Sequence, residues 1–112
     1  RVFDFDQDPD RDVQLASECG FQRILTSGAF GWSSDRTTLD SRILRIKKTV
    51  ESSIDHALRL DCAPLRVVAC GGIRACNASR FLTATVDLHA SCRVSGRLDE
   101  GSLEALVEMA RD

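Results

Sequence analysis

The chain has 112 residues, of which 43% are hydrophobic, so it is long and apolar enough to form one ordinary domain with a core. Its formal net charge is −2 at pH 7, and its basic residues are spread along the chain. This pattern argues against nucleic acid or an anionic membrane as a partner, and no run of about 18 apolar residues predicts a transmembrane helix.

The first predicted element is a helix that begins at Pro9. It follows RVFD, residues 1–4, which has the pattern of the end of an extended segment. Asp8 predicts an N-cap, Pro9 suits the first helical position, and Gly20 marks the point just past the helix end.

A short buried strand and a long helix come next. Ile24 and Leu25 are the apolar part of FQRILTSG, which we expect to break at the polar turn TSG. From about Thr38 to Leu60, apolar residues recur in steps of three and four, which predicts a helix with one stripe facing a core. That stripe contains Leu39, Ile43, Ile46, Val50, Ile54, Ala57 and Leu58.

Two further strands and two helices complete the chain. Pro64 stops the long helix, and LRVVACGG is the most strand-like run in the sequence. Asn77 is expected to cap a short helix that reaches Leu82, and VDLHASCR, residues 86–93, is the next strand. Asp99 is expected to cap the last helix. The apolar face of that helix contains Leu103, Leu106, Val107 and Ala110.

The alternation of strands and helices predicts an α/β fold with parallel strands joined by right-handed crossovers. Parallel strands place their carboxyl ends on one side, and each predicted strand carries its polar residues at that end. These ends are therefore expected to meet at one rim, as in α/β barrels. Ser, Thr and Gly also follow strands simply as loop residues, which is the alternative explanation. The residues are Arg1 and Asp4; Thr26, Ser27 and Gly28; Gly71 and Gly72; and His89, Ser91 and Arg93.

The last of these ends has an alternating pattern. Residues two apart in a strand point the same way, so His89, Ser91 and Arg93 are predicted to project together. A hydrogen-bonded core histidine beside a solvated strand end would give the same letters.

These residue types indicate a small anionic ligand. Glycines at a strand end let a ligand approach backbone N–H groups, and Arg1 and Arg93 are suited to hold a carboxylate or phosphate. Histidine changes charge near neutral pH, so His89 is the candidate acid or base, with Asp4 as its orienting or proton-accepting partner.

The five cysteines are odd in number, irregularly spaced and without a C-x-x-C pair, which indicates reduced thiols in a cytoplasmic protein. Thiolates that converge bind copper(I) or zinc, and Cys70, Cys76 and Cys92 lie near expected strand ends, where they are the candidate metal ligands. Cys19 and Cys62 lie in helical or helix-end patterns and are expected to pack as small apolar groups.

Four stretches resemble the second half of the CutC family, which is named for copper homeostasis. They are RVFD, GFQRILTSG, CGGI with Asn77 close behind, and LHASCR. RILTSG is the most specific of them, whereas Cys70 and Leu88 stand where the family pattern has glycine and phenylalanine. The resemblance implies a TIM barrel with these motifs on strands five to eight, and a polar mouth formed by the strand-end residues named above.

We therefore expect residues 1–112 to form a single domain, a partial TIM (β/α)8 barrel of about four β-α units. A complete barrel takes about 250 residues, so this domain is expected to be a fragment of a longer chain. The function that this resemblance implies is copper homeostasis, with copper as the bound ion. The alternatives are a TIM-barrel enzyme that acts on a small anionic substrate at the carboxyl rim, or a truncated inactive fragment. Open sheet edges predict self-association.

Overall fold

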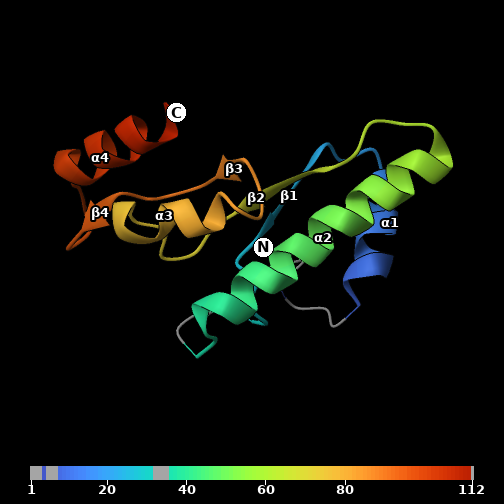
Figure 1. Cartoon of the computed structure of the whole chain (residues 1–112), viewed down its shortest axis with the longest axis horizontal. Helices are drawn as coiled ribbons and strands as arrows, with labels where there is room; N and C mark the ends of the chain where they lie inside the picture. Colours follow the sequence, from blue (N-terminus) through green and yellow to red (C-terminus); the bar gives the residue numbers. More distant parts are fainter. Residues whose placement is uncertain (1–3, 5–7, 32–35, 112) are drawn as a thin grey trace.

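The computed structural model describes residues 4, 8–31 and 36–111, which form helices α1–α4 and strands β1–β5 (Figure 1). None of these helices combines the length and apolarity needed to cross a membrane. In chain order the elements are α1 (Pro9–Glu18), β1 (Arg23–Thr26), α2 (Leu39–Leu60), β2 (Arg66–Ala69), α3 (Ala75–Phe81), β3 (Asp87–Leu88), β4 (Arg93–Val94), β5 (Arg97–Leu98) and α4 (Glu100–Ala110).

A parallel sheet in the order β1-β2-β3 lies at the centre of the fold. Thr26 pairs with Ala69, and Ala69 pairs with Leu88, so the three strands end at the same level. The ladder continues one residue past each strand, because Cys70 N donates to Thr26 O at 2.9 Å and His89 N donates to Ala69 O at 2.8 Å. The predicted parallel arrangement of these strands is therefore present.

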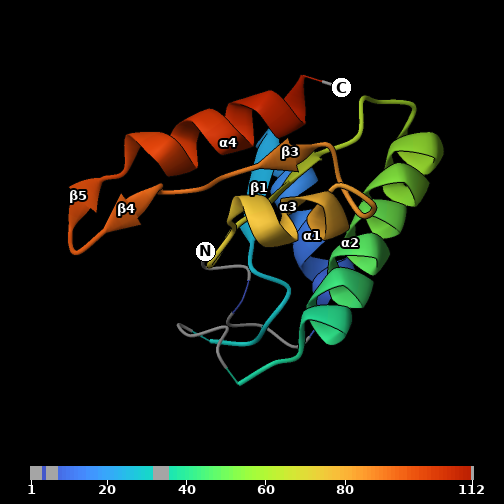
Figure 2. The same cartoon turned by 60° about the vertical axis from the view of Figure 1, so that its left-hand side comes forward.

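The predicted partial TIM barrel is wrong. In the part of the chain that the structure describes, the parallel sheet has three strands, and β4 and β5 form a separate antiparallel pair. The expected strand over residues 86–93 is interrupted because Cys92 has a φ of 49°, outside the extended range. Both views place the resulting hairpin beyond the end of the sheet, next to the start of α4 (Figure 2). Residues 1–3 of the expected first strand lie outside the described residues, and Asp4 is not in a strand.

The core lies between the sheet and the helices. Ile43 and Ile46 of α2 and Phe81 of α3 pack with Val67 and Ala69 of β2. The predicted stripe on α2 is buried or half-buried in its first half. In its second half Ala57 is buried, but Ile54 is 46% exposed and Leu58 is 77% exposed. In their place the second half of α2 buries polar side chains, which include Ser53 and His56. These side chains are buried because this half of α2 contacts α1 and the segment just before β2, and not because they continue an apolar stripe.

Local capping signals account for most helix ends. Asp8 accepts a hydrogen bond from Arg11 N, and Asp99 accepts one from Ser102 N, as expected for N-caps. The prediction for Asn77 is wrong in position, because α3 begins two residues before it. Asn77 Oδ1 accepts from Arg74 N at 2.8 Å and its Nδ2 donates to Gly72 O at 3.0 Å, so the side chain secures the turn from inside the helix.

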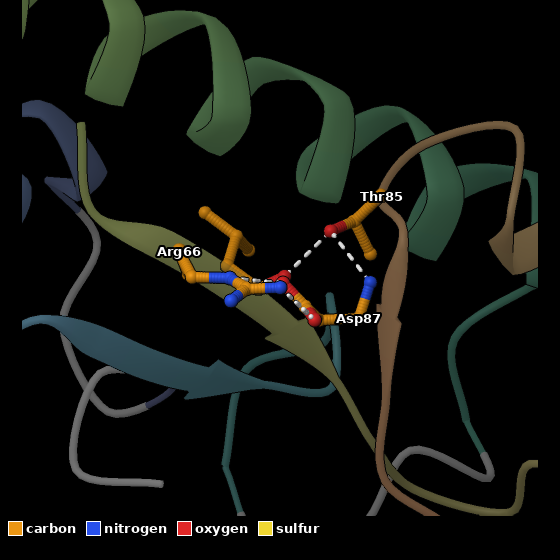
Figure 3. Close-up of polar contacts among 4 residues, drawn as sticks. Arg66, Thr85 and Asp87 are labelled. Atoms are coloured by element: carbon orange, nitrogen blue, oxygen red, sulfur yellow. Dashed lines mark hydrogen bonds and ion pairs between the residues drawn. The ribbon is translucent and has the colours of Figure 1, made fainter. Parts of the chain in front are cut away.

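An ion pair holds the amino ends of β2 and β3 together. The Arg66 guanidinium donates from Nε and Nη2 to the two carboxylate oxygens of Asp87, at 2.9 and 2.7 Å (Figure 3). Thr85 Oγ1 adds a bond of 2.5 Å to Val67 O. These contacts lie at the amino ends of the strands, opposite the polar rim. They stabilise the strand register and are not part of a site at the rim.

Candidate functional site

The carboxyl ends of β2 and β3 border a pocket of about 220 Å³. It brings together Gly71, Gly72, His89 and Ser91, which are four of the residues predicted for a ligand site. These residues lie close together because β2 and β3 end at the same level, and parallel strands that end together place the residues that follow them side by side. The remaining lining residues are Leu25, Cys70, Ile73, Arg74 and Ala90.

The alternation predicted for the stretch after β3 holds for two of its three polar residues. His89 and Ser91 both line this pocket, whereas Leu88 and Cys92 line a different cavity together with the apolar face of α4. The segment thus separates a polar side from an apolar side, as period-two geometry requires. His89 is an exposed residue of the pocket and not a core histidine.

Arg93 is not among the residues that line the pocket. The positive φ of Cys92 turns the chain before Arg93, which enters β4 and pairs with Leu98. Its side chain is exposed and approaches Gly96 O at 3.5 Å within the hairpin. The clamp predicted for Arg93 is therefore not formed in this arrangement, and Arg1, the other predicted clamp, lies outside the described residues.

The end of β1 forms a buried hydrogen-bond network around Asp4. Thr26 Oγ1 donates to Asp4 Oδ1 at 2.6 Å, and Ser27 donates from N and Oγ to Asp4 Oδ2 at 3.0 and 2.9 Å. Asp4, Thr26 and Ser27 are fully buried and do not line the pocket. Their position supports a structural role, in which the carboxylate fixes the turn after β1, and gives no support to Asp4 as the partner of His89.

Gly28 is required at this turn for a steric reason. Its φ is +74°, and a Cβ built there would lie 2.3 Å from the backbone oxygen of Arg42. The turn after β1 therefore rests directly on the first turn of α2. Gly28 therefore packs against α2 and is not among the residues that line the pocket.

Arg42 is a buried arginine that the sequence analysis did not identify, because it lies within the apolar stripe of α2. Its side chain donates from Nε to Ser27 O at 2.7 Å, and from Nη2 to Cys70 O and Gly71 O at 2.9 and 2.6 Å. The guanidinium also lies 4.9 Å from the centre of the Phe81 ring. From α2, Arg42 thus links the carboxyl ends of β1 and β2 through hydrogen bonds and adds positive charge next to the pocket.

Arg74 is the second residue that was missed. It is half-buried and lines the pocket together with His89. The signal was available in GGIR, where a basic residue follows the paired glycines. None of the described residues that line this pocket is acidic.

The three candidate metal ligands are not gathered at one place. Cys70 lines the pocket, Cys92 lines the cavity under α4, and Cys76 is exposed on α3. Over residues 4, 8–31 and 36–111, no group of three or more His, Cys, Asp or Glu side chains is placed to hold a metal ion. These cysteines do not fit a shared copper site in this arrangement, and the copper role stays a prediction.

Comparisons with models of protein families, with curated proteins and with solved structures gave no match. The resemblance to the CutC family therefore stays a prediction from the quoted motifs.

Proposed function

We propose that this protein binds a small anionic molecule, carrying a carboxylate or a phosphate group, in the pocket at the carboxyl ends of β2 and β3. The observation that carries the proposal is the composition of that pocket. Two donor side chains with basic character, Arg74 and His89, and one hydroxyl, Ser91, share it with two glycines. Arginine and histidine attract an anion, and arginine matches carboxylate and phosphate oxygens in geometry.

The backbone of the pocket supports the same conclusion. Gly71 and Gly72 both have positive φ values, 91° and 65°, and neither has a side chain that would keep a ligand away from the chain. Arg42 bonds the carbonyl oxygens of Cys70 and Gly71 from the core side. These acceptors are therefore already occupied, and the positive charge of Arg42 lies immediately behind them.

The proposal is tested by titrating the protein with inorganic phosphate and following backbone amide shifts. We expect shifts centred on Gly71, Gly72 and His89. Arg74→Gln should weaken binding about 10-fold or more, since a charge-assisted bond is lost. Arg93→Gln is the matched control, because it removes an arginine nearby that does not line the pocket, and we expect it to bind phosphate as the wild type does.

Two results would contradict the proposal. The first is phosphate binding that leaves the amides of Gly71, Gly72 and His89 unshifted. The second is equal weakening by Arg74→Gln and Arg93→Gln, which would show general attraction to surface charge instead of a site.

A further inference from the structure

Cys70 and His89 occupy neighbouring positions on one face of the sheet. Ala69 and Leu88 are partners in the parallel register, so the next pair along the strands is Cys70 and His89. His89 N donates to Ala69 O, which shows that the register continues that far. In-register residues of parallel strands point to the same side, and both residues line the same pocket.

Two arginines lie close to this pair. The Arg42 guanidinium donates to the carbonyl oxygen of Cys70 itself, at 2.9 Å, and Arg74 lines the same pocket. Nearby cationic groups favour the thiolate form of cysteine, which is the nucleophile, and an adjacent imidazole is a suitable acceptor for the thiol proton.

We infer that Cys70 is a nucleophile toward a small anionic molecule that carries an electrophilic carbon, with His89 as its proton acceptor. This inference rests on the proposed anion site and names the class of ligand that the site takes. The other reading of Cys70 is an inert core thiol, because the residue is only 2% exposed. The two readings predict opposite reactivities.

The covalent step balances without an oxidant or reductant. The Cys70 S–H bond breaks, its proton passes to a ring nitrogen of His89, and the sulfur electron pair forms a bond to the electrophilic carbon. The leaving group departs with the electrons of the bond that held it. With iodoacetate as the probe, the leaving group is iodide and the product is S-carboxymethylcysteine.

The experiment measures alkylation rates at each cysteine by mass spectrometry, with iodoacetamide and iodoacetate as two probes of the same chemistry and different charge. Cys76 is exposed and serves as the reference thiol within the same molecule. Cys92 is also buried, at 4% exposed, and lines a different cavity from His89, so its rate gives the reactivity of a buried thiol outside the pocket and rises if the fold opens.

We expect iodoacetamide to alkylate Cys70 about 10-fold faster than Cys76, despite the burial of Cys70. His89→Gln should lower the Cys70 rate about 10-fold or more while Cys92 stays unreactive. Arg93→Gln should leave the rate unchanged. Iodoacetate should raise the ratio of Cys70 to Cys76 rates further, and inorganic phosphate should reduce it.

The outcomes separate the two proposals. If Cys70 reacts no faster than Cys76 with iodoacetamide, or if His89→Gln leaves its rate unchanged, the inference about Cys70 is overturned whatever phosphate binding shows. If Cys70 is fast and depends on His89, but iodoacetate has no advantage and phosphate gives no protection, the thiol pair is supported and the anion site is refuted.

Discussion

Gly28 illustrates how a single residue is fixed by both its backbone and its surroundings. Its positive φ disfavours any side chain, and the backbone of Arg42 fills the space that a Cβ would need. Gly96 has nearly the same φ, +78°, but a Cβ there would meet nothing within 4 Å. A side chain at Gly96 would therefore meet backbone strain alone, whereas one at Gly28 would meet both strain and steric overlap.

We expect Gly28→Ala to lower the free energy of unfolding by at least about 2 kcal/mol more than Gly96→Ala does, because only the first adds an overlap to the strain. Urea unfolding of the two variants measures this difference. Equal losses would show that α2 can move away from the turn after β1, and that the close approach is not a fixed feature of the fold.

At the scale of an element, α2 supplies the arginine that hydrogen-bonds to the ends of two strands. Arg42 lies one turn into α2 and bonds carbonyl oxygens that follow β1 and β2. Arg42 is 7% exposed, and its removal would leave these buried or partly buried carbonyl oxygens without their donor. Arg66 provides a contrast. It forms a bidentate ion pair with Asp87, but its own side chain is 53% exposed.

Arg42→Met is expected to cost about 3 kcal/mol or more of unfolding free energy, whereas Arg66→Met should cost about 0–1 kcal/mol, because solvent screens an exposed pair. Chemical unfolding at matched salt concentration measures both. A loss for Arg42→Met as small as that for Arg66→Met would mean that water replaces the guanidinium easily, and that the strand ends are not held by α2.

At the scale of the whole molecule, the described part of the sheet ends at β1 on one side and at β3 on the other. Within the described residues, β1 and β3 each pair only with β2. His89 N bonds to Ala69 O, so the alternate amide, that of Leu88, points away from β2 toward the free edge of β3. Unpaired edges of this kind favour pairing with another chain.

The self-association predicted from the sequence is therefore expected at this edge. Hydrogen exchange at the Leu88 amide should slow as protein concentration rises, while exchange at the His89 amide stays the same because its partner is internal. Sedimentation velocity should show a larger species over the same range. A single monomeric species at every concentration would contradict the prediction.

Much of the pocket could be predicted from the sequence, and the parts that could not depend on distant contacts. Gly71, Gly72 and His89 were found because each follows a short apolar strand, and the parallel order then brings them together. Arg42 was missed because a buried arginine on an apolar stripe has no local signature. The predicted placement of Arg93 beside His89 and Ser91 is wrong, because the alternation was extended through Cys92, whose φ breaks it.

The barrel was predicted from the resemblance to the CutC family, together with an alternation of strands and helices that the structure shows for β1–β3. Of the strand expected over residues 86–93, only Asp87 and Leu88 pair in the parallel sheet, and an antiparallel hairpin follows them. The quoted motifs do not encode this difference, because the φ of one residue redirects the chain without changing its polar pattern.

The sequence by itself determined the helix ends at Asp8, Thr38 and Asp99 and the parallel pairing of three short strands. The helix starts depend on hydrogen bonds within a few residues. The parallel pairing follows from the alternation of short apolar strands with helices, because parallel neighbours need a long crossover between them. Only the tertiary structure decided that Arg42 bonds the strand ends, that Arg74 joins the pocket and that Cys70 lies beside His89. These juxtapositions depend on strand register and helix packing, which bring together residues far apart in the chain.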